Sequence, residues 1–181
     1  GVGKSSFALV LANLLSGDAG DRVQTVAERM GWTRDADAPS LWPLLVTGAR
    51  ESLALALARG VSEGLQRRRP KRATARWTRL ADKADDLVKR ADADAIVGLI
   101  DDVRSLADDD DSGVLLVIDE LGKLLEYAAA EPDREDVYLL QRLAQSAARS
   151  GDKPFFLVGL LHQGFQAYAE RLPTVTRHEW D

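Results

Sequence analysis

Strand-length apolar runs recur along this chain, and longer segments with helical patterns separate them. The runs Val114–Ile118 and Phe155–Leu161 are almost entirely apolar, and a shorter run, Leu44–Thr47, follows Pro43. Strands that are apolar throughout are typical of a parallel sheet with helices on both faces. The pattern therefore predicts an α/β fold in which these three strands belong to a three-layer core.

Helical patterns fill the segments between the runs. Residues 5–15 are nearly all apolar and predict a well-buried helix that ends at Gly17. Further helices are expected over residues 23–30, 51–66, 77–106 (as a pair), 121–130, 136–150 and 163–172. Within 51–66, an apolar residue recurs every fourth position and predicts one buried face: Leu53, Leu57, Val61 and Leu65. We predict one domain over residues 1–181, with a helical insertion at residues 51–107.

Composition narrows the class of protein. With 181 residues and 45% apolar content, the chain can bury a core, which excludes a disordered tail. It has no cysteine, so disulfides and thiol chemistry are excluded, and its two histidines, His162 and His178, are too few for a histidine-rich metal site. No apolar run approaches the ~20 residues of a membrane-spanning helix. We therefore expect a cytoplasmic protein without a membrane partner.

The first six residues carry the first chemical motif. Gly1-Val2-Gly3-Lys4-Ser5-Ser6 matches the second half of G-x-x-x-x-G-K-[ST] and is followed at once by an apolar helix. In such a loop, glycines let backbone N–H groups surround phosphate oxygens, the lysine reaches the β- and γ-phosphates, and the first serine binds Mg²⁺. The alternative is a glycine-lysine turn that merely opens a helix.

An acidic pair carries the second motif. Asp119-Glu120 follows directly after the apolar run Val114–Ile118, which is the pattern of a Walker B element. Asp119 would hold Mg²⁺, and Glu120 would activate the water that attacks the γ-phosphate. Acidic residues also suit an ordinary helix N-terminus, but the two motifs in this order favour a P-loop nucleotide site.

Two further observations refine the subclass. Glu120 beside the magnesium aspartate is typical of ATPases rather than GTP switches or small-molecule kinases, and no guanine-specific N/T-K-x-D follows a strand. Asp82-Lys83-Ala84-Asp85 resembles that motif but falls within a helical pattern. After the run Phe155–Leu161, His162 could sense the γ-phosphate, with Gln163 as a weaker candidate. The alternative is that His162 only caps a strand–helix junction.

Charge is unevenly distributed although the net charge is only −5. Between Arg59 and Arg79 there are eight basic residues and one acidic residue, Glu63. The segment Arg67–Arg72 could contact a phosphate backbone. We favour the alternative, a solvated connector between helices, and leave a nucleic-acid partner open.

The segments 113–127, 136–141 and 157–165 resemble large bacterial AAA-type P-loop ATPases with a D-E-L-G-K-x-L-E-Y Walker B region, some of them linked to phage-defence loci. That resemblance implies ATP, Mg²⁺ and a homo-oligomer or larger complex. By motif match, the resemblance also implies that Lys4, Ser5, Asp119 and Glu120 have the roles of the corresponding residues in that family. The family's strand order is 5-1-4-3-2, so we expect strands 2, 3 and 4 here, without the first and last core strands.

This truncated core has two expected consequences. The strand at residues 155–161 should have an unpaired apolar edge, and the segment alone should be inactive. The function favoured by the sequence is Mg²⁺-dependent ATP hydrolysis coupled to conformational change, in nucleic-acid transactions or defence. The alternative is an ATP-dependent oligomerisation switch or scaffold with little turnover. A small-molecule kinase is disfavoured by Glu120.

Overall fold

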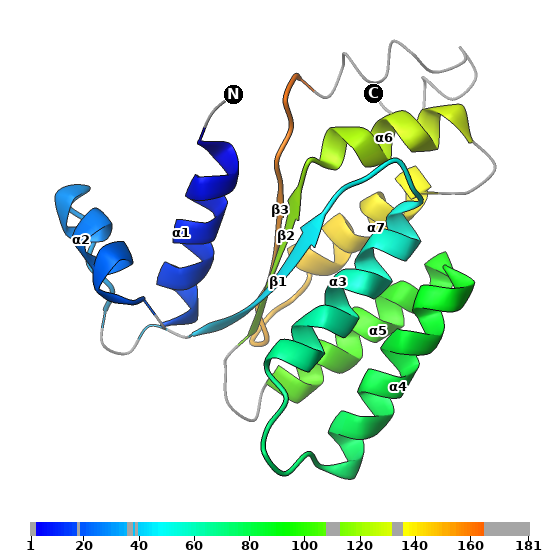
Figure 1. Ribbon diagram of the computed structural model, residues 1–181, viewed down its shortest axis with the longest axis horizontal. Coiled ribbons are helices and arrows are strands. Elements are labelled where there is room, and N and C mark those ends of the chain that lie inside the picture. The colour runs from blue at the N-terminus through cyan, green and yellow to red at the C-terminus, as the bar shows by residue number, and fades with distance from the viewer. Residues whose placement is uncertain are drawn as a thin grey trace.

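A computed structural model describes residues 3–17, 19–35, 38, 40–107, 113–131 and 136–164. Three strands, β1 (Leu41–Thr47), β2 (Gly113–Asp119) and β3 (Phe155–Gly159), form a sheet in the order β1-β2-β3, with both pairs parallel. The predicted α/β architecture, with these three strands adjacent and parallel, is confirmed. Because the strands are parallel, their carboxyl ends meet at one edge of the sheet (Figure 1).

The central strand β2 is buried on both faces. Val114, Leu116 and Ile118 belong to the larger apolar cluster, whereas Leu115 and Val117 belong to a smaller cluster on the opposite face. This alternation follows from the two-residue period of a strand. β2 begins at Gly113, one residue before the predicted run Val114–Ile118.

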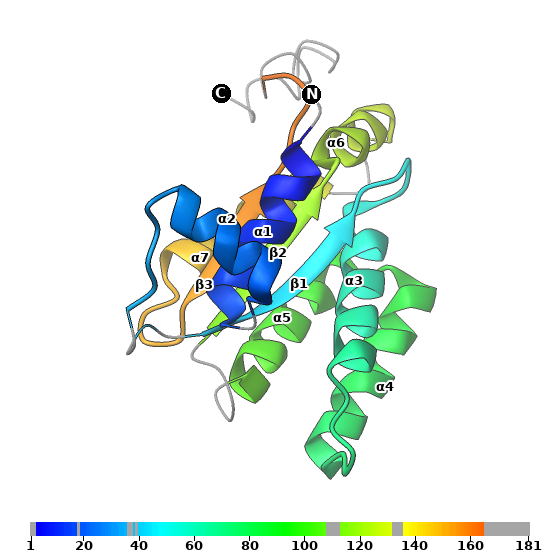
Figure 2. The ribbon, with the colours of Figure 1, turned by 60° about the vertical axis from the view of Figure 1, so that its left-hand side comes forward.

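One face of the sheet is covered by α1 (Lys4–Ser16), which packs on β1 and β2, while α2 (Asp21–Arg29) packs on α1 (Figure 2). Small side chains at Ala8 and Ala12 bring α1 close to the sheet. The prediction that this helix is well buried is wrong, because Phe7 and Leu9 are 54% and 50% exposed. Only the stripe of α1 that faces the sheet is covered by described residues.

The other face carries most of the helices. α3 (Leu53–Arg67) packs on β1, α5 (Ala93–Ala107) on β2 and α7 (Asp136–Ala148) on β3. α4 (Ala75–Arg90) packs on α3 and α5 and forms an outer layer, as Figure 1 shows. The four predicted positions of α3, from Leu53 to Leu65, are all buried. Between β1 and β2 the described residues form the three helices α3, α4 and α5, in agreement with the helical patterns predicted there.

Strand boundaries differ from the prediction at two places. β1 begins at Leu41 rather than Leu44, because Pro43 lies within it; an edge strand tolerates a residue without an N–H group. β3 ends at Gly159, so Leu160 and Leu161 follow the strand. In the described part of the chain β3 pairs only with β2, and Phe156 on it is 51% exposed. Within the part of the chain that the structure describes, the predicted unpaired edge of β3 is therefore present.

Two polar residues fix where α3 begins. Ser52 caps the helix by accepting a hydrogen bond from the Leu55 N–H at 3.2 Å. The buried Asp136 carboxylate accepts one from the Leu53 N–H at 3.0 Å and so links the start of α7 to the start of α3. The helix predicted over 163–172 is not helical at Gln163 and Gly164, and its remaining residues lie outside the described ones.

Candidate functional site

The acidic pair lies at the carboxyl end of the central strand. Asp119 is the last residue of β2 and pairs in register with Thr47 of β1. Its carboxylate accepts a hydrogen bond from the Glu120 N–H at 2.8 Å, and it makes no ion pair with a described residue. A carboxylate without a cationic partner at a strand end is free to bind a metal ion.

The residues of the phosphate-loop motif lie at the start of α1. The helix begins at Lys4 after Gly3, whose φ of 113° is in the left-handed region that glycine favours. Lys4 is half-buried, and Ser5 and Ser6 are exposed in the first turn. No side chain caps this helix end, and its first turn has no acidic residue. Gly1 and Val2 lie outside the described residues.

The start of α1 suits an anion. The first N–H groups of a helix have no partner within the helix and carry its partial positive charge. Lys4 adds a full charge and makes no ion pair with a described residue. The N-terminal end of α1 lies at the same edge of the sheet as the carboxyl ends of the strands (Figures 1 and 2).

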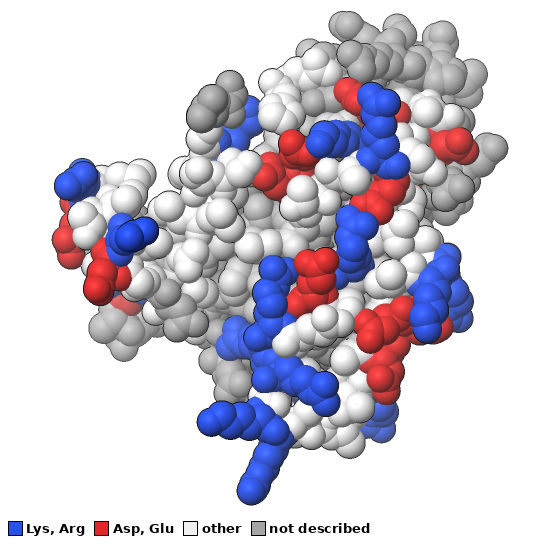
Figure 3. All heavy atoms as spheres, viewed as in Figure 1, with Lys and Arg blue, Asp and Glu red and all other residues white. Residues whose placement is uncertain are grey.

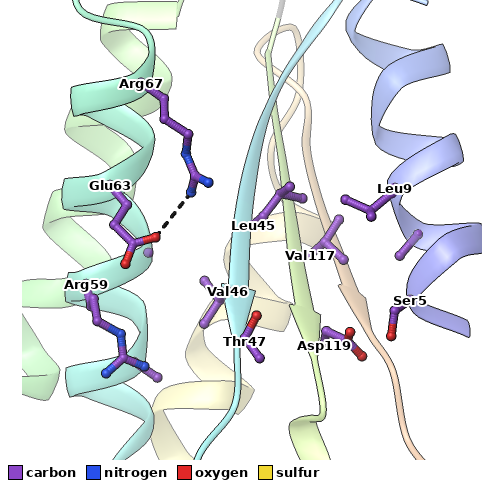
Figure 4. A pocket seen from close by; sticks show the side chains of 13 residues that line it. Ser5, Leu9, Leu45, Val46, Thr47, Arg59, Glu63, Arg67, Val117 and Asp119 are labelled. Carbon is purple, nitrogen blue, oxygen red and sulfur yellow. Dashed lines mark hydrogen bonds and ion pairs between the residues drawn. The ribbon is translucent and has the colours of Figure 1, made fainter.

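A cavity of about 310 Å³ joins the two motifs, and α1, β1, β2 and α3 all contribute to its lining. Ser5 and Asp119 both line it, and Figure 4 shows the serine hydroxyl and the aspartate carboxylate facing one another. One hydroxyl and one carboxylate fit Mg²⁺, which keeps most of its ligands from water and phosphate. Among the described residues no group of three or more His, Cys, Asp or Glu could form an all-protein metal cage.

Glu120 and His162 come together although they are far apart in the sequence. The His162 Nε2 lies 3.9 Å from the Glu120 Oε1. Two backbone hydrogen bonds place His162 there: Leu160 donates to Ile118 at 2.9 Å and accepts from Leu121 at 3.1 Å. The second carboxylate oxygen of Glu120 forms an ion pair with Lys123, in the first turn of α6 (Leu121–Ala130). Gln163 is exposed in the same segment.

Glu120 also has an unusual backbone. Its φ of 55° and ψ of 35° place it in the left-handed region, which costs a residue other than glycine roughly 1–2 kcal/mol. The sharp turn separates the roles of the pair: Asp119 faces the cavity, while Glu120 extends toward His162 and Lys123. Unusual backbone of this kind is concentrated at functional sites.

Sequence reasoning missed the polar residues that β1 and α3 contribute to the cavity lining, Thr47 and Arg59 among them. Thr47 lies at the end of β1 opposite Asp119, and Arg59 lines the cavity from α3 (Figure 4). Arg59 is held by Glu51 through two hydrogen bonds, one of them 2.9 Å long. The hydrogen bonding that Arg59 donates to the Glu51 carboxylate raises the pKa of Arg59 further above its ordinary value. Thr47 could have been found, since it is the polar residue that ends a predicted strand beside β2.

Comparison with known proteins found no matching family model, no matching curated protein and no matching solved structure. None of the described helices is both long and apolar enough to cross a membrane. The chemistry of the site therefore has to be inferred from its own residues.

Proposed function

We propose that this chain is the nucleotide-binding core of a P-loop ATPase that binds ATP with Mg²⁺ and hydrolyses it. One observation carries the proposal: Ser5 and Asp119, from distant segments, face one another in a cavity at the carboxyl ends of parallel strands. That edge of an open α/β sheet is where ligands bind in such folds. From the resemblance to AAA-type ATPases, we also propose that the protein works as a homo-oligomer or in a larger complex. Hydrolysis would then be coupled to a conformational change.

The start of α1 would hold the phosphates. The free N–H groups of its first turn, around Ser5 and Ser6, bind phosphate oxygens, and Lys4 neutralises charge on the β- and γ-phosphates. When bound, Mg²⁺ supplies further stabilisation of the charge on the transferred phosphoryl group. Ser5 and Asp119 are the residues that would hold it. The absence of an acidic residue in the first turn of α1 leaves this positive site uncompensated until the nucleotide binds.

Glu120 would act as the general base. Its carboxylate accepts a proton from the attacking water, and removal of such a base lowers a rate by about 10²- to 10⁴-fold. In the structure one carboxylate oxygen of Glu120 pairs with Lys123, and the other lies 3.9 Å from the His162 Nε2. These contacts would orient Glu120, and His162 would sense the γ-phosphate through Glu120.

The experiment compares steady-state ATPase activity of the full-length protein with that of Glu120→Gln. We expect ATP binding to persist while turnover falls by about 10²- to 10⁴-fold. The matched control is Glu131→Gln, an exposed glutamate at the end of α6, which should leave turnover unchanged. If Glu120→Gln hydrolyses ATP at the normal rate, Glu120 is not the base.

A different result would identify the alternative function. If the wild-type protein and Glu120→Gln both bind ATP and neither turns it over, the chain is a nucleotide-dependent switch that signals by oligomerisation. A phosphorylated small-molecule product formed in proportion to ATP consumed would instead show a kinase.

A further inference from the structure

Five exposed cations cluster where α3 is connected to α4, and we name them the basic connector. Its members are Arg69, Lys71, Arg72, Arg76 and Arg79. None of their side chains makes an ion pair or hydrogen bond with a described residue. Figure 3 shows a concentration of basic side chains on this part of the molecular surface. The cluster is local, because the whole chain has a net charge of −5.

Several other cations on the neighbouring helices are paired with carboxylates. Lys83 pairs with Asp102 and Arg90 with Asp86, and in α3 Arg67 pairs with Glu63. The five cations of the basic connector, from Arg69 to Arg79, have no such partner among the described residues. Because these positive charges lie close together without acidic partners, they repel one another. An anionic ligand would reduce that repulsion.

Aromatic residues pack next to the basic connector, at the start of α4. The Trp42 ring of β1 stacks on the Trp77 ring of α4, with centroids 5.6 Å apart and planes inclined by 17°. The Arg68 guanidinium lies over Trp42, 5.1 Å from the ring centroid. Thr74 caps α4 by accepting a hydrogen bond from the Trp77 N–H at 3.2 Å. This packing holds the start of α4, from which Arg76 and Arg79 extend, against β1, and a preformed backbone lowers the entropic cost of binding.

The composition of the cluster indicates its partner. Four of the five cations are arginines, whose planar forks suit phosphate oxygens. A membrane surface would need apolar anchors beside the charge. The exposed large hydrophobic residues of the described chain all lie outside residues 59–90: Phe7, Leu9, Val26, Met30, Tyr138 and Phe156. We propose that the basic connector binds the phosphodiester backbone of nucleic acid without reading its base sequence.

The test measures binding of fluorescent DNA and RNA duplexes of equal length by anisotropy, without nucleotide, so that it is independent of the proposed ATPase. If all five cations contact phosphates, the logarithm of affinity should fall with the logarithm of salt concentration with a slope of about −4.5. That slope lowers the affinity about 500-fold between about 50 and 200 mM salt. The variant R69Q/R72Q/R76Q should have a slope of about −1.8 and lose only about tenfold.

Two control variants separate this contact from general charge effects. The variant R22Q/R29Q/R149Q removes the same number of exposed arginines elsewhere and should bind as the wild type does. The variant R69K/R72K/R76K keeps the charge and should retain the salt dependence. The proposal is overturned if R69Q/R72Q/R76Q binds DNA and RNA as tightly as the wild type. It is also overturned if the wild type binds anionic vesicles and neither duplex.

Discussion

Gly48 lies where β1 approaches the acidic pair most closely. Its N–H donates a hydrogen bond to the Asp119 carbonyl at 2.8 Å. A Cβ atom added there would lie 2.5 Å from the carbonyl oxygen of Glu120 and 3.1 Å from the Leu124 Cγ. The nearest of these atoms belongs to the backbone, so the new methyl group cannot be accommodated by a side-chain rotation. Gly48→Ala should therefore push the end of β1 away from Asp119 and Glu120.

The cost of this change can be estimated from overpacking in cores, about 1–3 kcal/mol. With a urea m-value of about 2 kcal/mol/M, a loss of ~2 kcal/mol lowers the unfolding midpoint by about 1 M. The matched control is Gly98→Ala. Gly98 lies within α5 and has no heavy atom within 4 Å of its added Cβ, so alanine should stabilise the helix by about 0.5–1 kcal/mol.

The same variant reports on the site. A misplacement of about 1 Å can cost about 10²-fold in rate, so Gly48→Ala should lower ATPase activity of the full-length protein, while Gly98→Ala should not. Urea unfolding followed by circular dichroism and a steady-state ATPase assay measure the two effects. A Gly48→Ala protein as stable as the wild type, or more stable, would refute the geometry described for this junction.

Two further predictions concern stability. Hydrogen exchange should be faster at residues 155–159 than at 114–118, because β3 has an open edge among the described residues while β2 is paired on both sides; equal protection of the two strands would contradict the open edge. Asp136→Ala should lower the free energy of unfolding by about 1–3 kcal/mol, since it leaves the buried Leu53 N–H without its acceptor. The exposed Asp152→Ala is its control, and equal urea midpoints for the two variants would remove the role given to Asp136.

Much of the fold could be predicted because its central elements have simple patterns. The apolar run before Asp119 forms β2. The apolar residues spaced four apart from Leu53 to Leu65 lie on the buried face of α3. Burial of α1 could not be predicted from its apolar sequence. Apolar side chains are buried only where another element covers them, and among the described residues Phe7 and Leu9 stay half-exposed, Leu9 because it lines the open cavity between α1 and the sheet.

The site was predictable only in part, for a similar reason. Lys4, Ser5, Asp119 and Glu120 belong to short motifs, so their residue types and spacing were sufficient to select them. The approach of His162 to Glu120 depends on the backbone hydrogen bonds of Leu160 to β2 and α6, which no local pattern contains. Arg59 reaches the cavity only because α3 packs on β1.

The most direct test of the central claim is a structure of the full-length protein with Mg²⁺ and a non-hydrolysable ATP analogue. We expect the phosphates at the start of α1, with the Ser5 hydroxyl about 2.0–2.1 Å from the metal ion and Asp119 on the same ion, directly or through a water. Glu120 should face the γ-phosphate. A nucleotide bound elsewhere, or a metal ion that neither Ser5 nor Asp119 approaches, would contradict the account.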